Sequence, residues 1–201
     1  MRLIGSGRAS EVFDLGEGRV LRQFRTGGDA AREALVMRHA ASAGFPVPRV
    51  FEVRDGGLVL ERIEGRTMVD DASRPWTYPR HAGTLARLHQ QLHAIPAPRE
   101  VGRGALLHLD LHPANVIMSP SGPVVIDWTN AGAGDPALDV AMAWVILATS
   151  AGLRGRLFAR YFLTHFDRRG IREALPAAAE LRLADQNVTE RERLAIRRLA
   201  G

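Results

Sequence analysis

The sequence predicts an α+β chain of two lobes, a β-rich lobe over residues 1–64 and a mostly helical lobe over residues 65–201. Short apolar runs separated by glycine-containing turns fill the first part, a pattern typical of antiparallel strands. Long apolar patterns with helical spacing fill the second part. One turn-rich segment, residues 108–127, interrupts the helical part and carries most of the polar side chains suited to catalysis.

Composition is that of an ordinary globular protein. The 201 residues are 46% hydrophobic and 24% charged, and they include no cysteine, which excludes disulfides and thiolate chemistry. Because no signal-like N-terminus and no bilayer-length apolar stretch is present, we expect a cytoplasmic protein without a membrane partner. The net charge is +5 and every basic residue is arginine, but arginines and acids are interleaved, so we expect no nucleic-acid partner. The sequence specifies no oligomeric state.

The N-terminal lobe is predicted to contain four strands and one helix. Gly16-Glu17-Gly18 and Asp55-Gly56-Gly57 are turn signals between apolar runs, and Asp29 is a suitable N-cap. The predicted elements are strands over residues 12–15, 19–24, 49–53 and 58–63 and a helix over residues 30–43.

The second lobe is predicted to be helical on both sides of residues 108–127. Apolar positions recur at helical spacing over residues 78–94, and Asp135-Pro136 is a typical start for an apolar helix through residue 147. The remaining residues, 153–199, are predicted to be helical with breaks near Gly170, Pro176 and Asn187.

Three polar side chains in residues 108–127 suggest a reaction. Asp110 and Asn115 lie five apart on a loop that enters a strand, and Asp127 ends the next strand across a tight turn. A hairpin would bring Asn115 and Asp127 to the same end, where their oxygens suit Mg²⁺, a cation that takes few protein ligands. Asp110 would remain close by to orient a hydroxyl. This arrangement indicates phosphoryl transfer, in which catalysis is mostly positioning and charge neutralisation.

The same segment allows a second interpretation. His108, Asp110 and His112 form an H-x-D-x-H run, which is compatible with zinc in a metallohydrolase. No further cluster in the sequence supplies an evident completing ligand, so we favour structural roles for the two histidines. Asp139, inside an apolar helix, needs a buried partner, and we expect that partner to be His108.

Three motifs in order resemble the aminoglycoside phosphotransferase family, relatives of the protein kinases. His108-Leu109-Asp110-Leu111-His112-Pro113-Ala114-Asn115 resembles the catalytic loop of that family, and Ile126-Asp127-Trp128 resembles its metal-binding strand end. Gly134-Asp135-Pro136-Ala137-Leu138-Asp139 resembles the stretch that follows. The resemblance implies a two-lobed protein-kinase-like fold with a small antiparallel sheet, and transfer of the γ-phosphate of ATP or GTP to a hydroxyl of an unknown small molecule.

The resemblance also implies roles for individual residues in that segment. Asp110 would be the catalytic base, or would orient the acceptor hydroxyl, and Asn115 and Asp127 would hold Mg²⁺. His108, His112 and Asp139 would support the loop structurally.

A nucleotide site is implied in the first lobe. Gly5-Ser6-Gly7, at the start of a motif that continues through Phe13, resembles the glycine-rich loop over the phosphates. Relatives hydrogen-bond the purine with the strand joining the lobes, which here points to the Glu61 carbonyl and the Ile63 N–H.

The main departure from the family is Arg22, which stands where kinase-like enzymes place a lysine paired with a glutamate, here Glu33. An always-charged, forked guanidinium is not a neutral replacement for an ammonium group. The sequence therefore leaves open a catalytically weak or inactive nucleotide-binding regulator as an alternative.

Overall fold

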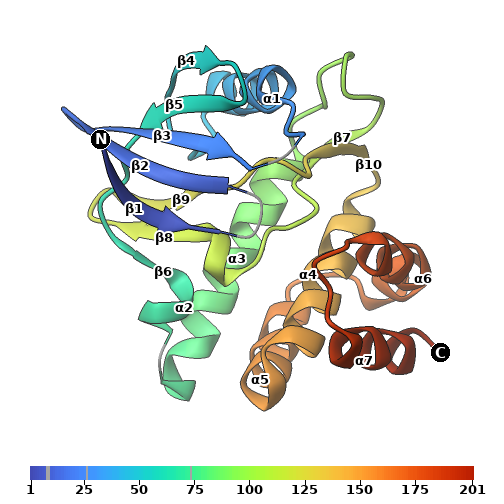
Figure 1. Cartoon of the computed structure of the whole chain (residues 1–201). Coiled ribbons are helices and arrows are strands. Elements are labelled where there is room, and N and C mark those ends of the chain that lie inside the picture. The colour runs from blue at the N-terminus through green and yellow to red at the C-terminus, as the bar shows by residue number, and fades with distance from the viewer. Residues whose placement is uncertain (8–9, 26, 73) are drawn as a thin grey trace.

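A computed structural model describes residues 1–7, 10–25, 27–72 and 74–201. The N-terminal lobe is a five-stranded antiparallel sheet with strand order β1-β2-β3-β5-β4, and one helix covers it (Figure 1). Its elements are β1 (Arg2–Ser6), β2 (Ser10–Gly16), β3 (Arg19–Phe24), α1 (Ala30–Ser42), β4 (Val50–Arg54) and β5 (Gly57–Glu61).

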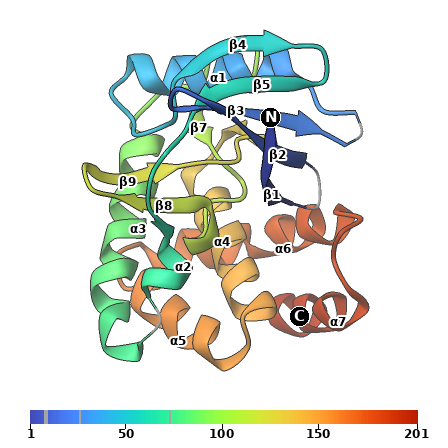
Figure 2. The ribbon, with the colours of Figure 1, turned by 60° about the vertical axis from the view of Figure 1, so that its left-hand side comes forward.

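The second lobe is built from helices, and small sheets connect it to the first (Figure 2). Strands form a three-stranded sheet ordered β6-β8-β9 and a two-stranded sheet of β10 and β7. The helices are α2 (Met68–Asp71), α3 (Tyr78–His93), α4 (Pro136–Ser150), α5 (Gly152–Leu163), α6 (Arg168–Ala184) and α7 (Glu190–Ala200), with 3₁₀ turns at Pro75–Thr77 and Pro113–Asn115. The strands are β6 (Arg66–Thr67), β7 (Ala105–Leu107), β8 (Val116–Ser119), β9 (Gly122–Val125) and β10 (Gly132–Gly134).

This architecture is the predicted two-lobed, kinase-like α+β fold. The boundary near residue 64 stays a prediction, because apolar residues of both parts belong to one continuous core. At the connection, Gly65 has a φ of 149°, and a Cβ there would collide with the Met118 carbonyl. Only glycine fits that close approach without strain. No helix in the described ranges is both long and apolar enough to cross a bilayer.

Two helix breaks predicted in the C-terminal region are wrong. α6 runs through Gly170 and Pro176, and the chain instead breaks at residues 164–167, where Asp167 caps α6 by accepting from the Arg169 and Gly170 N–H groups. Proline inside a helix costs about 3 kcal/mol. Burial of an apolar stripe on the helix offsets that cost, and its members are Ile171, Leu175, Ala178 and Ala179. The break near Asn187 lies between α6 and α7, as expected.

The sheet also contains a strand that the sequence did not predict. β1 includes Gly5 and Ser6, which pair with Val12 and Glu11 of β2. The glycine-rich motif is therefore the end of a hairpin rather than a free loop, closed by a hydrogen bond of 2.8 Å from the Gly7 N–H to the Ser10 carbonyl. Two further residues of that motif, Arg8 and Ala9, lie outside the described residues.

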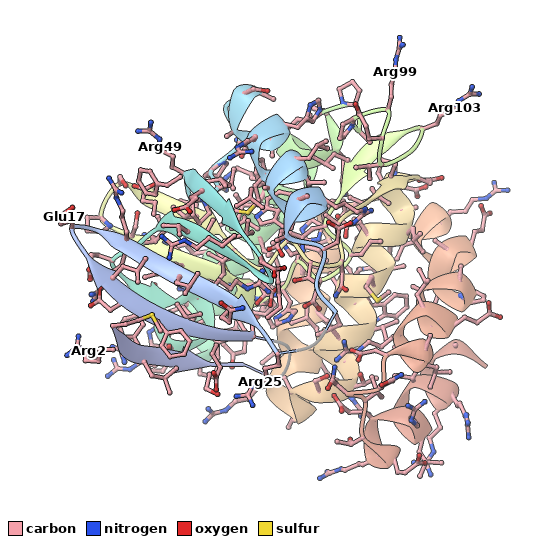
Figure 3. The ribbon with its side chains drawn as sticks, turned by 45° about the horizontal axis from the view of Figure 1, so that its top comes forward. Arg2, Glu17, Arg25, Arg49, Arg99 and Arg103 are labelled. Atoms are coloured by element: carbon pink, nitrogen blue, oxygen red, sulfur yellow. The ribbon has the colours of Figure 1, made fainter. Side chains whose placement is uncertain are left out.

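The surface arginines of the sheet lobe point in different directions. Figure 3 shows Arg2, Arg25 and Arg49 projecting separately from the sheet, and Arg99 and Arg103 from the loop that follows α3. Those five labelled side chains do not form a single basic stripe.

His89 makes the second lobe sensitive to acid. Its ring is fully buried on α3 beside Phe162, and its Nδ1 bonds the Leu85 carbonyl. Burial lowers the pKa of His89 from 6.5 to about 4. In the unfolded chain the His89 imidazole binds a proton near pH 6.5, whereas in the folded chain it does so only near pH 4. The free energy of unfolding therefore falls as the pH drops from 6.5 to 4.

We expect His89→Leu to remove this part of the acid sensitivity. The free energy of unfolding of the unaltered protein should lose roughly 3 kcal/mol more than that of the variant between pH 7 and pH 4. Urea denaturation at several pH values measures the difference. Parallel pH dependences for the two proteins would show that His89 is not responsible.

Candidate active site

A cleft of about 660 Å³ lies between the sheet and the β8–β9 hairpin. All of the residues predicted to bind nucleotide line it, namely Gly5, Ser6, Gly7, Arg22, Glu33, Glu61 and Ile63. Asp127, the predicted metal ligand, lines the same cleft. The glycine-rich hairpin, the central strand β3 and the connection between the lobes thus converge on one space, although they are distant in sequence.

Arg22 is the centre of a hydrogen-bond network in that cleft. Its side chain points inward from β3 and is only 8% exposed. The guanidinium pairs with Glu33 of α1 and with Asp127, as well as donating to the Thr129 hydroxyl at 2.9 Å and the Ser10 hydroxyl at 3.1 Å. The predicted Arg22–Glu33 ion pair is therefore present. The branched guanidinium reaches four partners, where an ammonium group offers only three donors.

Glu33 is fixed from several sides. Besides Arg22, it accepts from the Trp128 backbone N–H at 3.2 Å and from the Thr129 hydroxyl at 3.3 Å. Burial raises the pKa of Glu33, and the charge of Arg22 opposes that effect. The network thereby attaches α1 to the segment that follows β9. The sequence analysis did not identify Thr129 as a site residue. Its position two residues after Asp127 could have indicated that its side chain lies near the Asp127 carboxylate.

The predicted hairpin is present and is formed by β8 and β9. Val116 pairs with Val125, and the Ile126 N–H donates to the Asn115 carbonyl at 3.0 Å. Asn115 and Asp127 therefore stand at the same end of the hairpin. Asp127 has a φ of 63°, a left-handed conformation that turns the chain sharply out of the strand.

Asp110 and Asn115 contact each other directly. The Asn115 Nδ2 donates to the Asp110 backbone carbonyl at 2.9 Å and to its Oδ2 at 3.1 Å. Burial, followed by the nearby charge of Asp127, raises the pKa of Asp110 to about 7. The Asn115 Nδ2 donates both of these hydrogen bonds, so the Oδ1 of the same amide is the atom that could bind a cation.

The donor set suits magnesium better than zinc. Asn115 and Asp127 offer oxygen ligands, and one Asp127 oxygen is already bonded to Arg22 and Thr129. Mg²⁺ uses one or two protein carboxylates together with phosphate and water. Among the described residues, no group of three or more His, Cys, Asp or Glu side chains is arranged to hold a metal.

The two histidines of the H-x-D-x-H run are committed to the loop, which contradicts the metallohydrolase alternative. His108 contacts the Ile126 carbonyl through Nε2 at 3.1 Å, and its Nδ1 accepts from the Asp110 N–H at 3.3 Å. His112 accepts from the Ala114 N–H through Nδ1 at 3.3 Å. Burial lowers the pKa of both imidazoles, to about 4 for His112, so both are neutral.

Asp139 holds the loop that carries Asp110, but its imidazole partner is a different histidine from the one expected. Its carboxylate is fully buried on α4 and accepts from the backbone N–H groups of His108 at 3.2 Å and Leu109 at 2.6 Å. Its imidazole partner is His93 of α3, at 2.9 Å, and not the His108 ring. Burial alone would raise the pKa of Asp139, but the His93 hydrogen bond and the neighbouring histidines hold it well below its ordinary value.

A second, smaller cavity of about 370 Å³ adjoins the loop that carries Asp110 and His112. Asp127 lines this cavity as well as the cleft, and Asp110 lines only the small cavity. Helices α4, α6 and α7 and the loop before α7 contribute the other polar walls, which include Ser150, Arg182, Asp185, Asn187 and Glu192. Sequence reasoning assigned no role to these residues.

Asp70 and Asp71 lie elsewhere in the second lobe, in α2. Asp70 bonds Thr67 at the start of α2. Asp71 faces His81 of α3 at 3.4 Å. Neither lines the cavity beside Asp110.

Comparison with known proteins gives a consistent result. The model of the phosphotransferase enzyme family matches residues 1–104 and 96–174. A thiamine kinase of Escherichia coli is 46% identical over 66 residues, which are 33% of this chain and 23% of that protein. A thiamine kinase of Shigella boydii is 42% identical over 59 residues, covering 29% of this chain and 21% of that protein. The matched segments thus span less than a quarter of these curated relatives.

Solved structures share the fold across nearly the whole chain. The aminoglycoside phosphotransferase APH(4)-Ia, as a thermostable mutant without ligand, has a TM-score of 0.70 at 19% identity, over 99% of this chain and 94% of that chain. ADP-bound APH(2'')-Ib has a TM-score of 0.67 at 17% identity, over 99% and 91%. Identities this low show a common fold only. Because the family model covers well over half of the residues, the chain belongs to the phosphotransferase enzyme family.

Proposed function

We propose that this protein transfers the γ-phosphoryl group of ATP or GTP to a hydroxyl of a small molecule in a Mg²⁺-dependent reaction. One observation carries the proposal: Asp127 lines both the large cleft and the small cavity, whereas Asp110 lines only the small one. A nucleotide in the cleft and an acceptor in the cavity would meet at Asp127. Related folds bound to AMP-PNP or ADP support a nucleotide in the donor role.

The donor side would be held by the sheet and the connection between the lobes. Gly5, Ser6 and Gly7 line the cleft, and their backbone would approach the phosphates. Glu61 and Ile63 line it too, and the Glu61 carbonyl and the Ile63 N–H would hydrogen-bond the purine edge. Arg22, whose fork is anchored by Glu33, faces the same space and would attract the phosphates. Bound Mg²⁺, held by Asn115 and Asp127, would neutralise phosphate charge.

On the acceptor side, Asp110 would orient the hydroxyl. The acceptor oxygen would bond to the γ-phosphorus as the bond to the β–γ bridging oxygen breaks, and the hydroxyl proton would pass to Asp110. The pKa of about 7 is close to the range that a general base needs near neutral pH. Asn115 holds the carboxylate through Nδ2, and Asp139 holds the loop backbone, so both would act as positioning residues.

The proposal is tested by an acceptor panel followed through nucleoside diphosphate formation. Thiamine is the first compound to test, because short segments of thiamine kinases match this chain. Hygromycin B follows, because a structural neighbour is described with it. Tight binding of the Mg²⁺-nucleotide complex without any turnover would favour the alternative function, a nucleotide-binding regulator. The observation that supports this alternative is Arg22, which stands where kinase-like enzymes have a lysine.

Asp127→Asn should abolish the Mg²⁺-dependent part of nucleotide stabilisation, because it removes the anionic metal ligand. For the unaltered protein, ligand at 100 times its dissociation constant should add about 2.7 kcal/mol to the free energy of unfolding. Thermal denaturation with and without Mg²⁺ measures this gain. Asp185→Asn is the matched control, since Asp185 lines only the small cavity of the two. An Asp127→Asn protein that keeps the full gain would contradict the metal role.

A further inference from the structure

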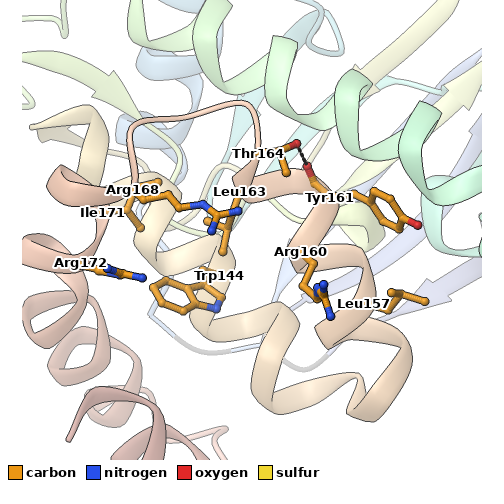
Figure 4. Close-up of a pocket in the computed structure, with 9 residues that line it drawn as sticks. All are labelled: Trp144, Leu157, Arg160, Tyr161, Leu163, Thr164, Arg168, Ile171 and Arg172. Atoms are coloured by element: carbon orange, nitrogen blue, oxygen red, sulfur yellow. Dashed lines mark hydrogen bonds between the residues drawn. The ribbon is translucent and has the colours of Figure 1, made fainter.

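Trp144 forms part of a cavity that lies away from the catalytic cleft. The cavity has a volume of about 470 Å³ and is walled by α4, α5 and α6 (Figure 4). It shares no lining residue with the cleft or with the small cavity beside Asp110. Its walls combine the Trp144 indole with apolar side chains, which include Leu157, Leu163 and Ile171.

Three arginines face this cavity, and none of its lining residues in the described part of the chain is a carboxylate. Figure 4 shows Arg160, Arg168 and Arg172 around the Trp144 indole, with Arg160 and Arg172 on opposite sides of it in this view. Among the described residues, none of the three guanidinium groups has a hydrogen-bond or ion-pair partner. The nearest carboxylate in sequence, Asp167, is engaged in capping α6.

The spacing of these arginines is unfavourable without an anion. Arg168 and Arg172 are four residues apart on one face of α6, an arrangement in which two like charges destabilise an isolated helix. Arg168 also lies in the first turn, where the helix dipole opposes a cation. On the neighbouring face of the same helix, Arg169 does have a carboxylate partner, Glu173, at 3.0 Å. The lack of carboxylate partners is therefore specific to the arginines that face the cavity.

The same pattern recurs on the other side of Trp144. A second cavity of about 340 Å³ shares Trp144, Arg160 and Leu163 with the first and adds Arg156 and Arg198, again without a carboxylate. Arg156 and Arg160 are four residues apart on α5. No arginine in the described residues stacks on Trp144, whereas Arg74 lies 5.2 Å from the centroid of Trp76. The Trp144 indole can therefore contact a ligand, and the arginines around it are positively charged.

We propose that the Trp144 cavity is a second ligand site, which binds a small molecule bearing a planar ring and a phosphate group. The indole and the apolar walls would pack against the ring. Arg168 and Arg172, with Arg160 opposite, would bind the phosphate through charge-assisted hydrogen bonds. The concave shape and the small volume favour a small ligand over a macromolecule.

Phenyl phosphate is the probe for this site, with phenol and inorganic phosphate as the two half-ligands. The three tryptophans give three indole N–H signals in a ¹H–¹⁵N spectrum, which single Trp→Phe variants assign. Phenyl phosphate, at up to roughly 10 mM, should shift the Trp144 signal with a millimolar or tighter dissociation constant. Each half-ligand should bind at least about tenfold more weakly, a difference of roughly 1.4 kcal/mol.

The arginines are tested by a matched pair of variants. The double variant Arg168→Gln/Arg172→Gln should weaken phenyl phosphate binding by about tenfold or more, because it removes two donors of charge-assisted hydrogen bonds to the phosphate. Arg169→Gln, on the adjacent face of α6, should change it less than about twofold. Equal binding by both variants, no shift of Trp144, or a shift confined to the Trp128 signal near the cleft would each overturn the proposal.

Discussion

Asp110→Asn is expected to lower kcat for phosphoryl transfer by about 10²- to 10⁴-fold, the usual contribution of a positioned general base. The change keeps the size of the side chain and an oxygen that can accept from the Asn115 Nδ2, now at 3.1 Å. It removes the group that would take the acceptor proton. Nucleotide affinity should hardly change, because Asp110 does not line the large cleft.

Steady-state formation of nucleoside diphosphate, with the acceptor found in the panel, measures kcat, and calorimetry measures nucleotide binding. Asp185→Asn is again the control, since it removes a carboxylate from the same small cavity but one that is paired with Arg182 at 3.0 Å. If the two variants lose activity equally, the negative charge of the cavity determines kcat, and a general base at position 110 does not. A kcat within threefold of normal in Asp110→Asn would mean that Asp110 is misassigned.

Arg22→Met is expected to reduce the free energy of unfolding by about 3–5 kcal/mol, the usual cost of removing one partner of a buried ion pair. The Arg22 and Glu33 side chains are 8% and 3% exposed, so Glu33 would remain in a nearly dry site without the cation that favours its ionised form. The Ser10 and Thr129 hydroxyls would also lose a donor. Arg22→Lys should cost less, because it keeps the charge but not the fork.

A double-mutant cycle separates the ion pair from packing. Glu33→Gln in the Arg22→Met background removes the carboxyl group that has lost its cationic partner. The double variant should therefore be more stable than the sum of the two single losses in free energy of unfolding predicts. Urea denaturation gives all four free energies. Additive losses, or a loss below about 1 kcal/mol for Arg22→Met, would show that the guanidinium is solvated in solution and that the network contributes little.

The parts of the site that local sequence determines were predicted well. The Ser-Pro-Ser-Gly-Pro turn between two apolar runs was enough to predict the hairpin, and the hairpin places Asn115 beside the end of β9. The Arg22–Glu33 pair was implied by the resemblance to the family, and its two partners lie on a strand and a helix that are adjacent in sequence. In each case the partners are joined by one short connection whose geometry is restricted.

Contacts between distant segments were not predictable in the same way. Asp139 was known to need a buried partner, but His93 and His108 were equally available in the sequence, and only the packing of α3 against α4 selects His93. The course of α6 through Pro176 depends on burial against α4, which outweighs local propensity. Arg182 enters the small cavity for the same reason, so its place near Asp110 has no local signal.

The attachment of residues 108 and 109 to Asp139 has a consequence for thermal inactivation. Leu109 has a φ of 61°, which a leucine rarely adopts, and the carboxylate on α4 accepts its N–H. The turn that presents Asp110 is thus held by the central helix α4 in addition to the hydrogen bonds within the loop. We therefore expect heating to abolish the proposed phosphoryl transfer in the same step that unfolds α4, with no earlier stage in which the core is folded but the transfer reaction is already lost.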